Sequence, residues 1–399
     1  MLIGDGMADR PVGELDGLTP LQAARTPNMD RLAREGSVGM AKTLPEGLPN
    51  GSDVANLGIL GYDPRKYYTG RAPLEAASMG IRLESGDVAF RCNFVTLDFN
   101  PSRPDAVMVD HSAGQLATEE GHKLIEELNR RLAAGGIRFY PGVSYRNIML
   151  WAGGEAGLDC TPPHDILGKK IREYLPKGKR AEVVKDLMRA SVDILEAHPV
   201  NKGRVAGGKR PANSIWLWGQ GGKPELPPFA EVYGLKGAMV SAVDLAKGLA
   251  ASAGLEVINV PGATGYLDTN YEGKAIYALQ ALEKADFVYV HVEAPDEASH
   301  EGKLEEKIKA IEDFDAKVVG TVLEGIGRFP GGCRILVMPD HATPLEARTH
   351  TQEPVPFIVY DSTGKGGGAK AYDESIGSAA GVLRIDAHNL MRFLLEGEV

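Results

Sequence analysis

Four short apolar runs, each followed by Gly, Pro or Asp, constrain the fold of this chain most strongly. They are MLIGDG at residue 1, FVYVHVEAPD near 290, RILVMPDHAT near 336 and PFIVYDSTG near 358. Runs of this kind are typical of buried strands in a parallel sheet. Stretches with helical spacing lie between them, at 26–36, 241–253, 273–285 and 303–323. This alternation predicts an α/β fold with a doubly wound, mostly parallel sheet.

The middle of the chain has a different pattern. Strand-like pieces (VAFRCNFVTLDF, DAVMVDHSAG, RNIMLWAGG, ANSIWLWGQGG) occur there with two helical stretches, 118–134 and 181–197. Gly- and Pro-rich segments, LGYDPRKYYTGRAP and GQGGKPELPP, flank this region. We therefore expect an α+β domain at 69–226, inserted between parts 1–68 and 227–399 of the α/β domain. The GKGGG segment at 364–368 is expected to form a surface turn and not a phosphate loop.

Composition excludes several classes of protein. The 44 Lys and Arg residues against 54 Asp and Glu residues give a net charge of −10, which argues against nucleic-acid or anionic-membrane binding. The three cysteines are widely spaced and form no CxxC pair, so we expect neither a disulfide framework nor a cysteine zinc site. No apolar run approaches the roughly 20 residues of a membrane span, and MLIGDGMADRP does not resemble a signal peptide. We expect a cytoplasmic protein.

Acidic and histidine side chains follow several of the predicted strands. They are Asp5, Asp296, His300, Asp340, His341 and, a little later, His350. Ligands of open α/β sheets bind beyond the carboxyl ends of the strands. Asp296 and His300 are four residues apart, so a helix beginning there would place them on one face. Each Asp has an alternative role as a helix N-cap, but convergence at one sheet edge favours a site for Mn²⁺, Mg²⁺ or Zn²⁺.

Ser52 lies in GLPNGSDVANLGILGY, where Gly51 permits a tight turn and a helix can begin. A hydroxyl at this place is at the positive end of the helix dipole. The simple alternative is that Ser52 only caps the helix. A serine that attacks phosphorus needs activation, which a divalent ion would supply by lowering the pKa of the hydroxyl.

Eight segments, in order along almost the whole chain, resemble one family. They are DGMAD at 5–9, TPNMDRLAREG at 26–36, PNGSDVANLGILGYDP at 49–64, YYTGRAPLEAASMGI at 67–81, FRCNFVTLD at 90–98, DHSAG at 110–114, PDEASHEG at 295–302 and PDHATP at 339–344. Together they are similar to the archaeal-type, 2,3-bisphosphoglycerate-independent phosphoglycerate mutases of the alkaline phosphatase superfamily. The resemblance implies an alkaline-phosphatase-like, metal-binding domain interrupted by a substrate-binding domain.

The resemblance also implies two divalent ions and a reaction cycle. One ion would be held by Asp296, His300 and His350. The other would be held by Asp5, Ser52, Asp340 and His341. Ser52 would take the phosphoryl group from phosphoglycerate, and the bound glycerate would turn over and take it back on its other hydroxyl. No 2,3-bisphosphoglycerate would be needed.

The substrate of such a cycle, a small phosphorylated carboxylic acid, requires fixed cations. Arg71, Arg91 and Arg146 lie within or beside the matched segments, and bidentate arginine suits both phosphate and carboxylate. Lys236, in YGLKGAM, is a further candidate. The alternative for each is a solvated surface charge. Arg91 is the strongest candidate, because it interrupts an apolar strand.

Asp110 and His111, in VMVDHSAG, are candidates for moving protons to and from the glycerate hydroxyls. Their alternative is an Asp that caps the helix after residue 117, beside a His with no role. With substrate residues in one domain and metal residues in the other, closure would exclude water from the phosphoserine.

Other activities stay open at this level. A related branch, proposed to act as a homoserine kinase in threonine synthesis, shares the metal motifs. No GK pair is followed by Ser or Thr, so a Walker A loop for ATP is absent from the sequence. The same residues would make a phosphatase if water were admitted. The segment PANSIWLWGQGG offers no basic residue near Trp218, where a mutase pocket is expected to have one.

Overall fold

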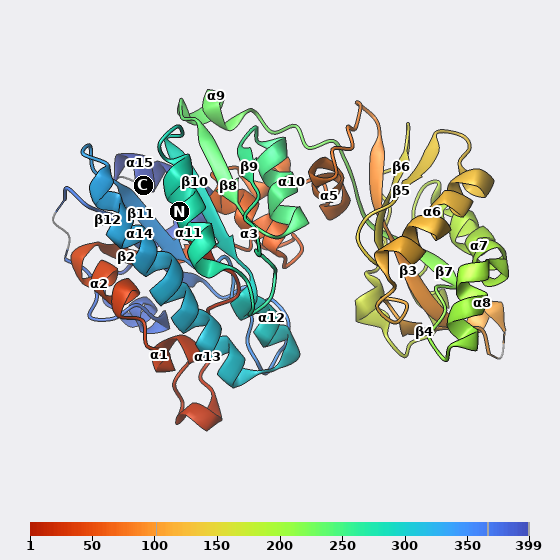
Figure 1. Ribbon diagram of the computed structural model, residues 1–399, viewed down its shortest axis with the longest axis horizontal. Coiled ribbons are helices and arrows are strands. Elements are labelled where there is room, and N and C mark those ends of the chain that lie inside the picture. Colours follow the sequence, from red (N-terminus) through yellow and green to blue (C-terminus); the bar gives the residue numbers. More distant parts are fainter. Residues whose placement is uncertain (101, 365–366, 398–399) are drawn as a thin grey trace. The chain divides into compact units, whose positions relative to one another are not determined.

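The computed structural model describes residues 1–100, 102–364 and 367–397. It divides into two compact units (Figure 1). The discontinuous unit comprises Met1–Tyr68 and Leu226–Val399, and the inserted unit comprises Thr69–Glu225. Residues 365 and 366, in the middle of the GKGGG segment, lie outside the described residues. The metal-binding and substrate-binding roles of the two units stay predictions.

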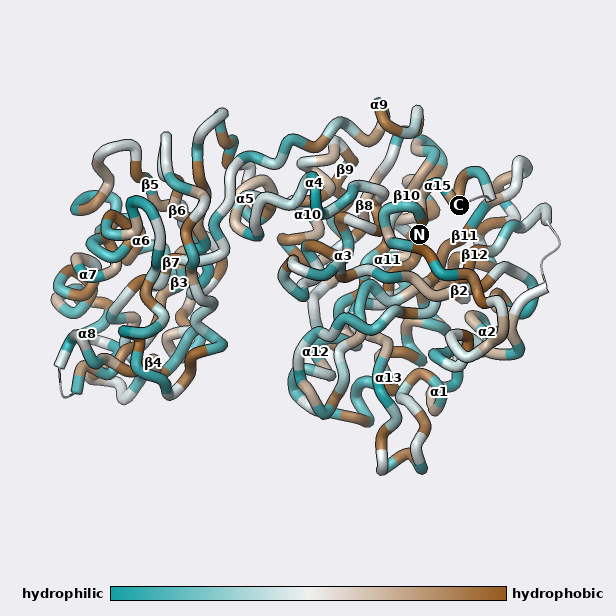
Figure 2. Tube along the Cα trace, turned by 180° about the vertical axis from the view of Figure 1, so that it is seen from behind, coloured by the Kyte–Doolittle hydropathy of each residue, from teal (hydrophilic) through white to brown (hydrophobic). Residues whose placement is uncertain are grey.

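The discontinuous unit is built on an eight-stranded sheet of described residues. Its order is β13 (Leu383–Asp386), β2 (Ser37–Lys42), β12 (Val355–Asp361), β11 (Arg334–Met338), β1 (Leu2–Gly4), β10 (Phe287–Val292), β8 (Gly237–Val240) and β9 (Glu256–Ile258). Every strand except β12 runs in the same direction, so the expected α/β fold with a mostly parallel sheet is confirmed. Figure 2 shows hydrophobic stretches near β2 and β12 and hydrophilic loops around them.

The expectation that PFIVYDSTG forms a parallel strand is wrong. This segment is β12, which is antiparallel to both β11 and β2. The chain returns from β11 through residues 339–354, which contain no helix. A parallel neighbour needs a crossover connection, usually helical, whereas a direct return produces an antiparallel strand. An apolar composition indicates that both faces of a strand are buried, but it does not determine whether the strand is parallel or antiparallel to its neighbours.

Helices cover both faces of this sheet (Figure 1). One face packs against α2 (Pro27–Glu35), α11 (Tyr271–Ala281) and a continuous helix formed by α13 (Leu304–Asp313), a π-helical turn (Phe314–Val319) and α14 (Gly320–Gly325). The other face packs against α3 (Ser52–Ile59), α10 (Asp244–Ser252) and α15 (Leu390–Glu396). Side chains alternate along a strand. Val288, Val290 and Val292 of β10 therefore enter the α11 core, and Tyr289 and His291 face α3.

The inserted unit contains a five-stranded antiparallel sheet. Its longest strand, β3 (Val88–Asp98), pairs with β4 (Val107–Asp110), β6 (Arg146–Trp151) and β7 (Ser214–Gly222), and β5 (Ile137–Tyr140) pairs with β6. The helices α6 (Thr118–Leu132), α7 (Ala181–Ala197) and α8 (Pro199–Ala206) pack together around one core, and α5 (Arg71–Ser78) packs on β3, β6 and β7. Phe90, Cys92 and Phe94 lie in the larger core, whereas Ala89 contacts the α5 side. Arg91 lies on that same α5 side by alternation.

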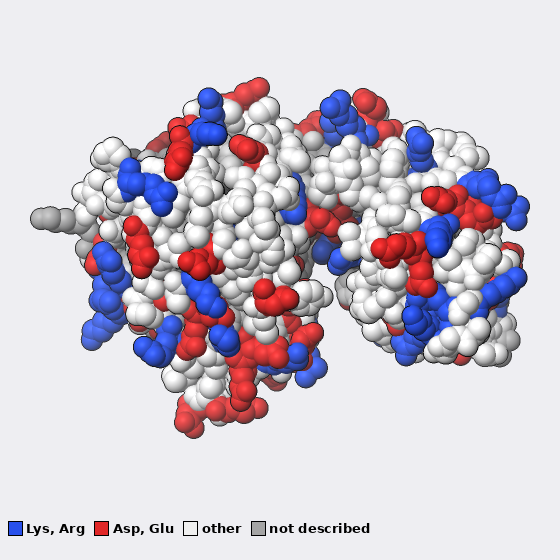
Figure 3. All heavy atoms as spheres, in the orientation of Figure 1, with Lys and Arg blue, Asp and Glu red and all other residues white. Residues whose placement is uncertain are grey.

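Two expectations about the whole chain can be compared with the described structure. Cys92, Cys160 and Cys333 are free thiols in it. Among the described residues, no helix has both the length and the apolar character required to cross a membrane. On the face shown in Figure 3, acidic and basic side chains are interspersed.

A buried ion pair ties α13 to the segment after β1. The Lys307 ammonium is fully buried, donates to Asp9 Oδ2 at 2.7 Å and donates to the Thr343 carbonyl at 3.0 Å. Asp9 in turn accepts from the Leu345 amide at 3.2 Å. Burial lowers the pKa of Lys307, although the Asp9 charge opposes that shift.

We expect Lys307→Met to lower the free energy of unfolding by about 3–5 kcal/mol, because Asp9 is left charged and buried without its partner. Lys309→Met is the matched control on the same helix: Lys309 is exposed and pairs with Asp313, so its loss is expected to change stability by less than about 1 kcal/mol. Urea denaturation followed by circular dichroism measures both. Equal effects of the two substitutions would contradict the assignment.

Candidate functional site

The predicted acidic and histidine residues gather at one edge of the discontinuous unit's sheet. Asp5 follows β1, the helix α12 (Ala294–Glu301) follows β10, and Asp340 follows β11. These three strands are neighbours, and their parallel order brings their carboxyl ends together. Ser52 comes to the same edge as the first residue of α3. His350 reaches it from the segment between β11 and β12.

Asp296, His300 and His350 form the first group of possible metal ligands. His300 Nε2 lies 3.1 Å from Asp296 Oδ2 and 3.0 Å from His350 Nε2. The other nitrogen of each ring contacts a backbone carbonyl: His300 Nδ1 is 2.9 Å from the Arg348 oxygen, and His350 Nδ1 is 3.0 Å from the Asn50 oxygen. A carbonyl accepts only from N–H, so the proton of each neutral ring is on Nδ1 and both Nε2 lone pairs face the centre of the group.

Asp5, Ser52, Asp340 and His341 lie together beside this group. Ser52 Oγ is 3.0 Å from His341 Nε2, which is 3.4 Å from Asp5 Oδ1 and 3.6 Å from Asp340 Oδ2. The Asp340 carboxylate is oriented by the Gly6 amide at 3.2 Å and by Asn56 Nδ2 at 2.7 Å. These four residues are the ones that the resemblance implied for a second ion.

Thr343, which sequence reasoning missed, links the two groups. Its hydroxyl donates to Asp296 Oδ1 at 2.6 Å and lies 3.1 Å from His341 Nδ1. Because the hydroxyl gives its own proton to Asp296, it accepts from His341 Nδ1–H. His341 Nε2 is then unprotonated and faces the Ser52 hydroxyl. A Thr two residues after a predicted ligand was the only sequence signal for this role.

The capping alternatives are not what the structure shows. Gly51 is the N-cap of α3, and Ser52 is the first helical residue, with its hydroxyl directed to His341. The N-cap of α12 is Glu293, so Asp296 lies inside the helix and shares a face with His300, as its spacing predicted.

Burial and mutual charge shift the pKa values of these groups. Burial, with the Asp340 and Asp296 charges, raises the pKa of Asp5 well above its usual range. Burial lowers the pKa of His341 to about 4, so this ring is neutral. For His300, burial would lower the pKa, but the hydrogen bond and charge of Asp296 outweigh it and raise the pKa to about 9. Three buried carboxylates in one place favour cations, and the buried Asp5 Oδ1 has no hydrogen-bond partner among the described residues. Oxygen and neutral imidazole donors fit a hard or borderline divalent ion.

Metal binding to the first group should release protons. Burial opposes a raised pKa for His350 too, but the Asp296 charge raises it nonetheless. Below a pH of about 9, His300 is protonated in the metal-free protein, so a metal must displace that proton. We expect affinity for Mn²⁺ to rise with pH up to about 9, by about tenfold per pH unit for each proton displaced. Calorimetric titration in buffers of different ionisation enthalpy measures the release, and heats that are independent of the buffer would contradict it.

The inserted unit brings three of the predicted arginines around one carboxylate. Arg91 Nε is 2.9 Å from Glu75 Oε2, and Arg71 Nε is 3.0 Å from Glu75 Oε1. Burial would raise the pKa of Glu75, but Arg91, Arg71 and Arg146 together lower it. Burial lowers the pKa of Arg91 to about 10. Three cations against one anion leave a net positive charge that suits an anionic ligand.

Arg91 also supplies the basic residue that was expected near Trp218. Its guanidinium lies 4.5 Å from the centre of the Trp218 ring, where a cation–π contact stabilises it. The residue comes from β3 and not from the apolar segment that contains Trp218, because the two strands pair at Arg91 and Trp218.

Asp110 and His111 lie at the end of β4. Asp110 accepts hydrogen bonds from Ser112, Gly114 and Arg210, which outweigh burial and lower its pKa. It therefore caps the turn after β4, whereas the N-cap of α6 is Ala117. Burial lowers the pKa of His111, and its buried Nδ1 has no hydrogen-bond partner among the described residues.

A second histidine, which sequence reasoning missed, lies beside His111. The His164 ring is 6.1 Å from the His111 ring and 5.4 Å from Trp218. It comes from a PPH segment that carries no strand or helix pattern. The sequence pattern alone therefore could not place His164 beside His111.

Lys236 does not join the predicted metal-site residues of its own unit. It immediately precedes β8, at the amino end of the parallel strands, and its side chain is exposed. The metal-site residues lie at the opposite, carboxyl ends of the same strands. A cation placed before a parallel strand cannot share that edge, so we leave Lys236 out of the proposed site.

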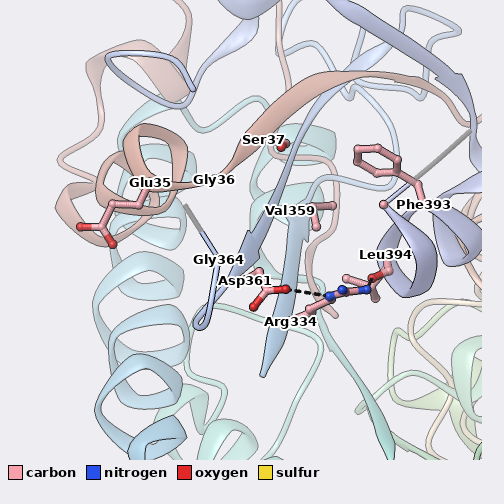
Figure 4. Close-up of a pocket in the computed structure, with 10 residues that line it drawn as sticks. Glu35, Gly36, Ser37, Arg334, Val359, Asp361, Gly364, Phe393 and Leu394 are labelled. Atoms are coloured by element: carbon pink, nitrogen blue, oxygen red, sulfur yellow. Dashed lines mark hydrogen bonds and ion pairs between the residues drawn. The ribbon is translucent and has the colours of Figure 1, made fainter. Parts of the chain in front are cut away.

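One cavity of about 160 Å³ also lies at the amino-end edge, bounded by β2, β11, β12 and α15 (Figure 4). Arg334 within it pairs with Asp361 at 2.9 Å and donates to the carbonyls of Leu394 and Leu395. These contacts of the Arg334 guanidinium hold α15 to the sheet. This cavity has a structural role.

Comparisons with known proteins agree with this arrangement. Residues 33–201 match the family model of 2,3-bisphosphoglycerate-independent phosphoglycerate mutase. A Geobacter sulfurreducens protein, described as a probable 2,3-bisphosphoglycerate-independent phosphoglycerate mutase, is 54% identical over 397 residues, covering 99% of both chains. The chain belongs to this family. A mutase of Methanothrix thermoacetophila is 53% identical over 397 residues, covering 100% of this chain and 99% of its own.

Two solved structures share the fold of this family member. The PH0037 protein of Pyrococcus horikoshii superposes with a TM-score of 0.83 at 32% identity, covering 99% of this chain and 95% of that one. The cofactor-independent phosphoglycerate mutase of Thermoplasma acidophilum superposes with a TM-score of 0.65 at 30% identity, covering 99% and 97%. The predicted archaeal-type mutase family is confirmed, and with it an enzyme of the isomerase class.

Proposed function

We propose that this enzyme interconverts 3-phosphoglycerate and 2-phosphoglycerate through a phosphoserine on Ser52, without 2,3-bisphosphoglycerate. One observation carries the proposal: the Ser52 hydroxyl lies 3.0 Å from the unprotonated Nε2 of His341, in the middle of the buried Asp and His groups. Family membership supports the substrate, and the geometry supports the nucleophile.

Two divalent ions fit the donor sets. Asp296, His300 and His350 would hold one, and Asp5, Ser52, Asp340 and His341 would hold the other. When bound, such ions neutralise charge on the phosphoryl group and lower the pKa of the serine hydroxyl.

The residues of the chain account for the other requirements of the first step. Ser52 Oγ forms a bond to phosphorus while the bond from phosphorus to the glycerate oxygen breaks. Ser52 is the first residue of α3, and the positive end of the helix dipole favours a phosphate there. Asn56 Nδ2 and the Gly6 amide hold Asp340, and Thr343 holds both His341 and Asp296. This support fixes the geometry before substrate binds.

The reverse step needs the glycerate to be retained and its other hydroxyl to be deprotonated. We assign the carboxylate to Arg71, Arg91 and Arg146, whose charge exceeds that of Glu75. His111 is the better proton carrier of its pair, because it is neutral and its Nδ1 is unpaired. Asp110 is engaged in its turn, where it accepts hydrogen bonds from Ser112 and Gly114.

Loss of Arg91 should weaken substrate binding. Hydrogen bonds to charged groups contribute about 1.5–3 kcal/mol, so we expect Arg91→Gln to raise KM by roughly 10- to 150-fold. Arg103→Gln is the matched control in the same unit, since Arg103 is exposed and pairs with Asp193. Steady-state kinetics with 3-phosphoglycerate measures both. An unchanged KM for Arg91→Gln would remove this residue from the substrate site.

The proposed reaction is tested by coupling to enolase. Purified enzyme with Mn²⁺ is expected to convert 3-phosphoglycerate to 2-phosphoglycerate at a rate that added 2,3-bisphosphoglycerate does not change. Release of free phosphate as the main product would favour a phosphatase. ATP-dependent phosphorylation of homoserine without mutase turnover would favour the kinase branch. Either outcome would overturn the proposal.

A further inference from the structure

His291 is a buried histidine that the proposed reaction does not use. It lies on β10, is 2% exposed and faces α3 with Tyr289. Neither ring nitrogen has a hydrogen-bond partner among the described residues, although both are buried. Leaving a buried polar group unsatisfied costs about 1–3 kcal/mol. Buried polar atoms of this kind call for a bound ion or water.

Two carboxylates face this ring. Asp5 Oδ2 is 3.1 Å from His291 Nε2, but the two atoms are not aligned as a hydrogen bond. Ligand atoms of Asp5, His291 and Asp340 all lie within 4.8 Å of one another. The same distance of 3.1 Å separates His300 Nε2 from Asp296 Oδ2 in the first metal group. Two ligand atoms of the same ion lie about this far apart, and each points at the ion and not at the other atom.

The His291 group shares Asp5 and Asp340 with the set proposed for the ion at Ser52 and differs from that set in His291. Asp5 directs Oδ2 to His291 and Oδ1 to His341, which is 3.4 Å away. His341 belongs to another set, with Asp5 and Asp296. Asp5 is therefore placed to bridge two ions through its two oxygens.

The charge around His291 suits a cation. Asp5 and Asp340 are 1% and 0% exposed, so their charges are not screened by water. The Lys274 ammonium donates to the His291 carbonyl at 3.1 Å. A neutral imidazole has one nitrogen lone pair that can bind an ion.

We propose that Asp5, His291 and Asp340 bind a third divalent cation, which shares the Asp5 and Asp340 carboxylates with the ion at Ser52. The donors, two carboxylates and one imidazole, suit Mn²⁺, Mg²⁺ or Zn²⁺. All three ligands are almost completely buried, which suits a structural ion. The ion therefore fixes the Asp5 carboxylate and joins the ends of β1, β10 and β11. This site goes beyond the proposed function, which needs two ions.

Metal stoichiometry tests the proposal. Metal-free enzyme is equilibrated with Mn²⁺ by dialysis, and bound Mn²⁺ is counted by atomic spectrometry. We expect three ions per chain in the unchanged enzyme and two in His291→Leu, which removes the donor with little change in volume. His122→Leu is the control, because His122 is an exposed histidine of the inserted unit whose Nε2 lies 3.1 Å from the Gly142 carbonyl oxygen. It should bind three.

Each outcome decides something different. Two ions in the unchanged enzyme would overturn the third site and leave the proposed function intact. Three ions in His291→Leu would also overturn it, by showing that His291 is not a ligand. No bound ions would contradict the third site and the proposed function together. The count in the unchanged enzyme needs no variant, so poor folding of His291→Leu, detected by circular dichroism, does not prevent the test.

Discussion

Replacement of Ser52 by alanine is expected to lower kcat for mutase turnover by about 10⁴- to 10⁶-fold, the range seen when a nucleophile is removed from an enzyme. The physical reason is that His341 Nε2 lies 3.0 Å from Ser52 Oγ and that, among the described residues, no other hydroxyl is placed against it. Without that oxygen the phosphoryl group has no acceptor on the protein. The enolase-coupled assay measures the loss.

Ser37→Ala is the matched control for this prediction. Ser37 begins β2 and is exposed at the opposite edge of the sheet, so its loss is expected to leave turnover unchanged. Mutase activity that survives Ser52→Ala would refute the phosphoserine mechanism. A decrease of equal size in Ser37→Ala would show that the assay reports stability and not chemistry.

Removal of the divalent ions should have the second largest effect. Chelation is expected to abolish turnover, and added Mn²⁺ is expected to restore it. Asp296→Asn should lower kcat on the order of 10³-fold, because it weakens a metal site that supplies several kcal/mol of charge stabilisation. Asp296 is the carboxylate shared by His300, His350 and Thr343, so its charge holds the first group together.

The control for this second prediction is Asp386→Asn, at the exposed end of β13. It should keep full activity and the same response to chelator. Full activity after exhaustive chelation would contradict a metal-dependent reaction. Full activity of Asp296→Asn with Mn²⁺ present would remove Asp296 from the first metal group.

Much of the candidate site could be predicted because its residues sit at strand ends. Asp5, Asp296 and Asp340 follow apolar runs, and parallel strands place such positions at one edge whatever the details of packing. The spacing of Asp296 and His300 needed only helical geometry. These features depend on local periodicity, which a single sequence contains.

The missed features depend on which face a side chain takes and on which way a strand runs. His291 lies within an apolar run of the sequence. Side chains alternate between the two faces of a strand, so His291 faces either the α11 core or the carboxylates, and only the strand pairing shows which. The strand β12 is antiparallel to β11 because the chain connects them without a crossover helix. The Lys307 and Asp9 pair joins residues 298 positions apart, and no local pattern contains that contact.

Trapping the intermediate tests the central claim most directly. The enzyme with Mn²⁺ is mixed with 3-phosphoglycerate, quenched in acid within one turnover and digested, and its peptides are analysed by mass spectrometry. We predict one added phosphoryl group on Ser52, which appears with substrate and is lost when free glycerate is supplied. Turnover at the full rate with no phosphoryl group on Ser52, or with the group on another residue, would contradict the account.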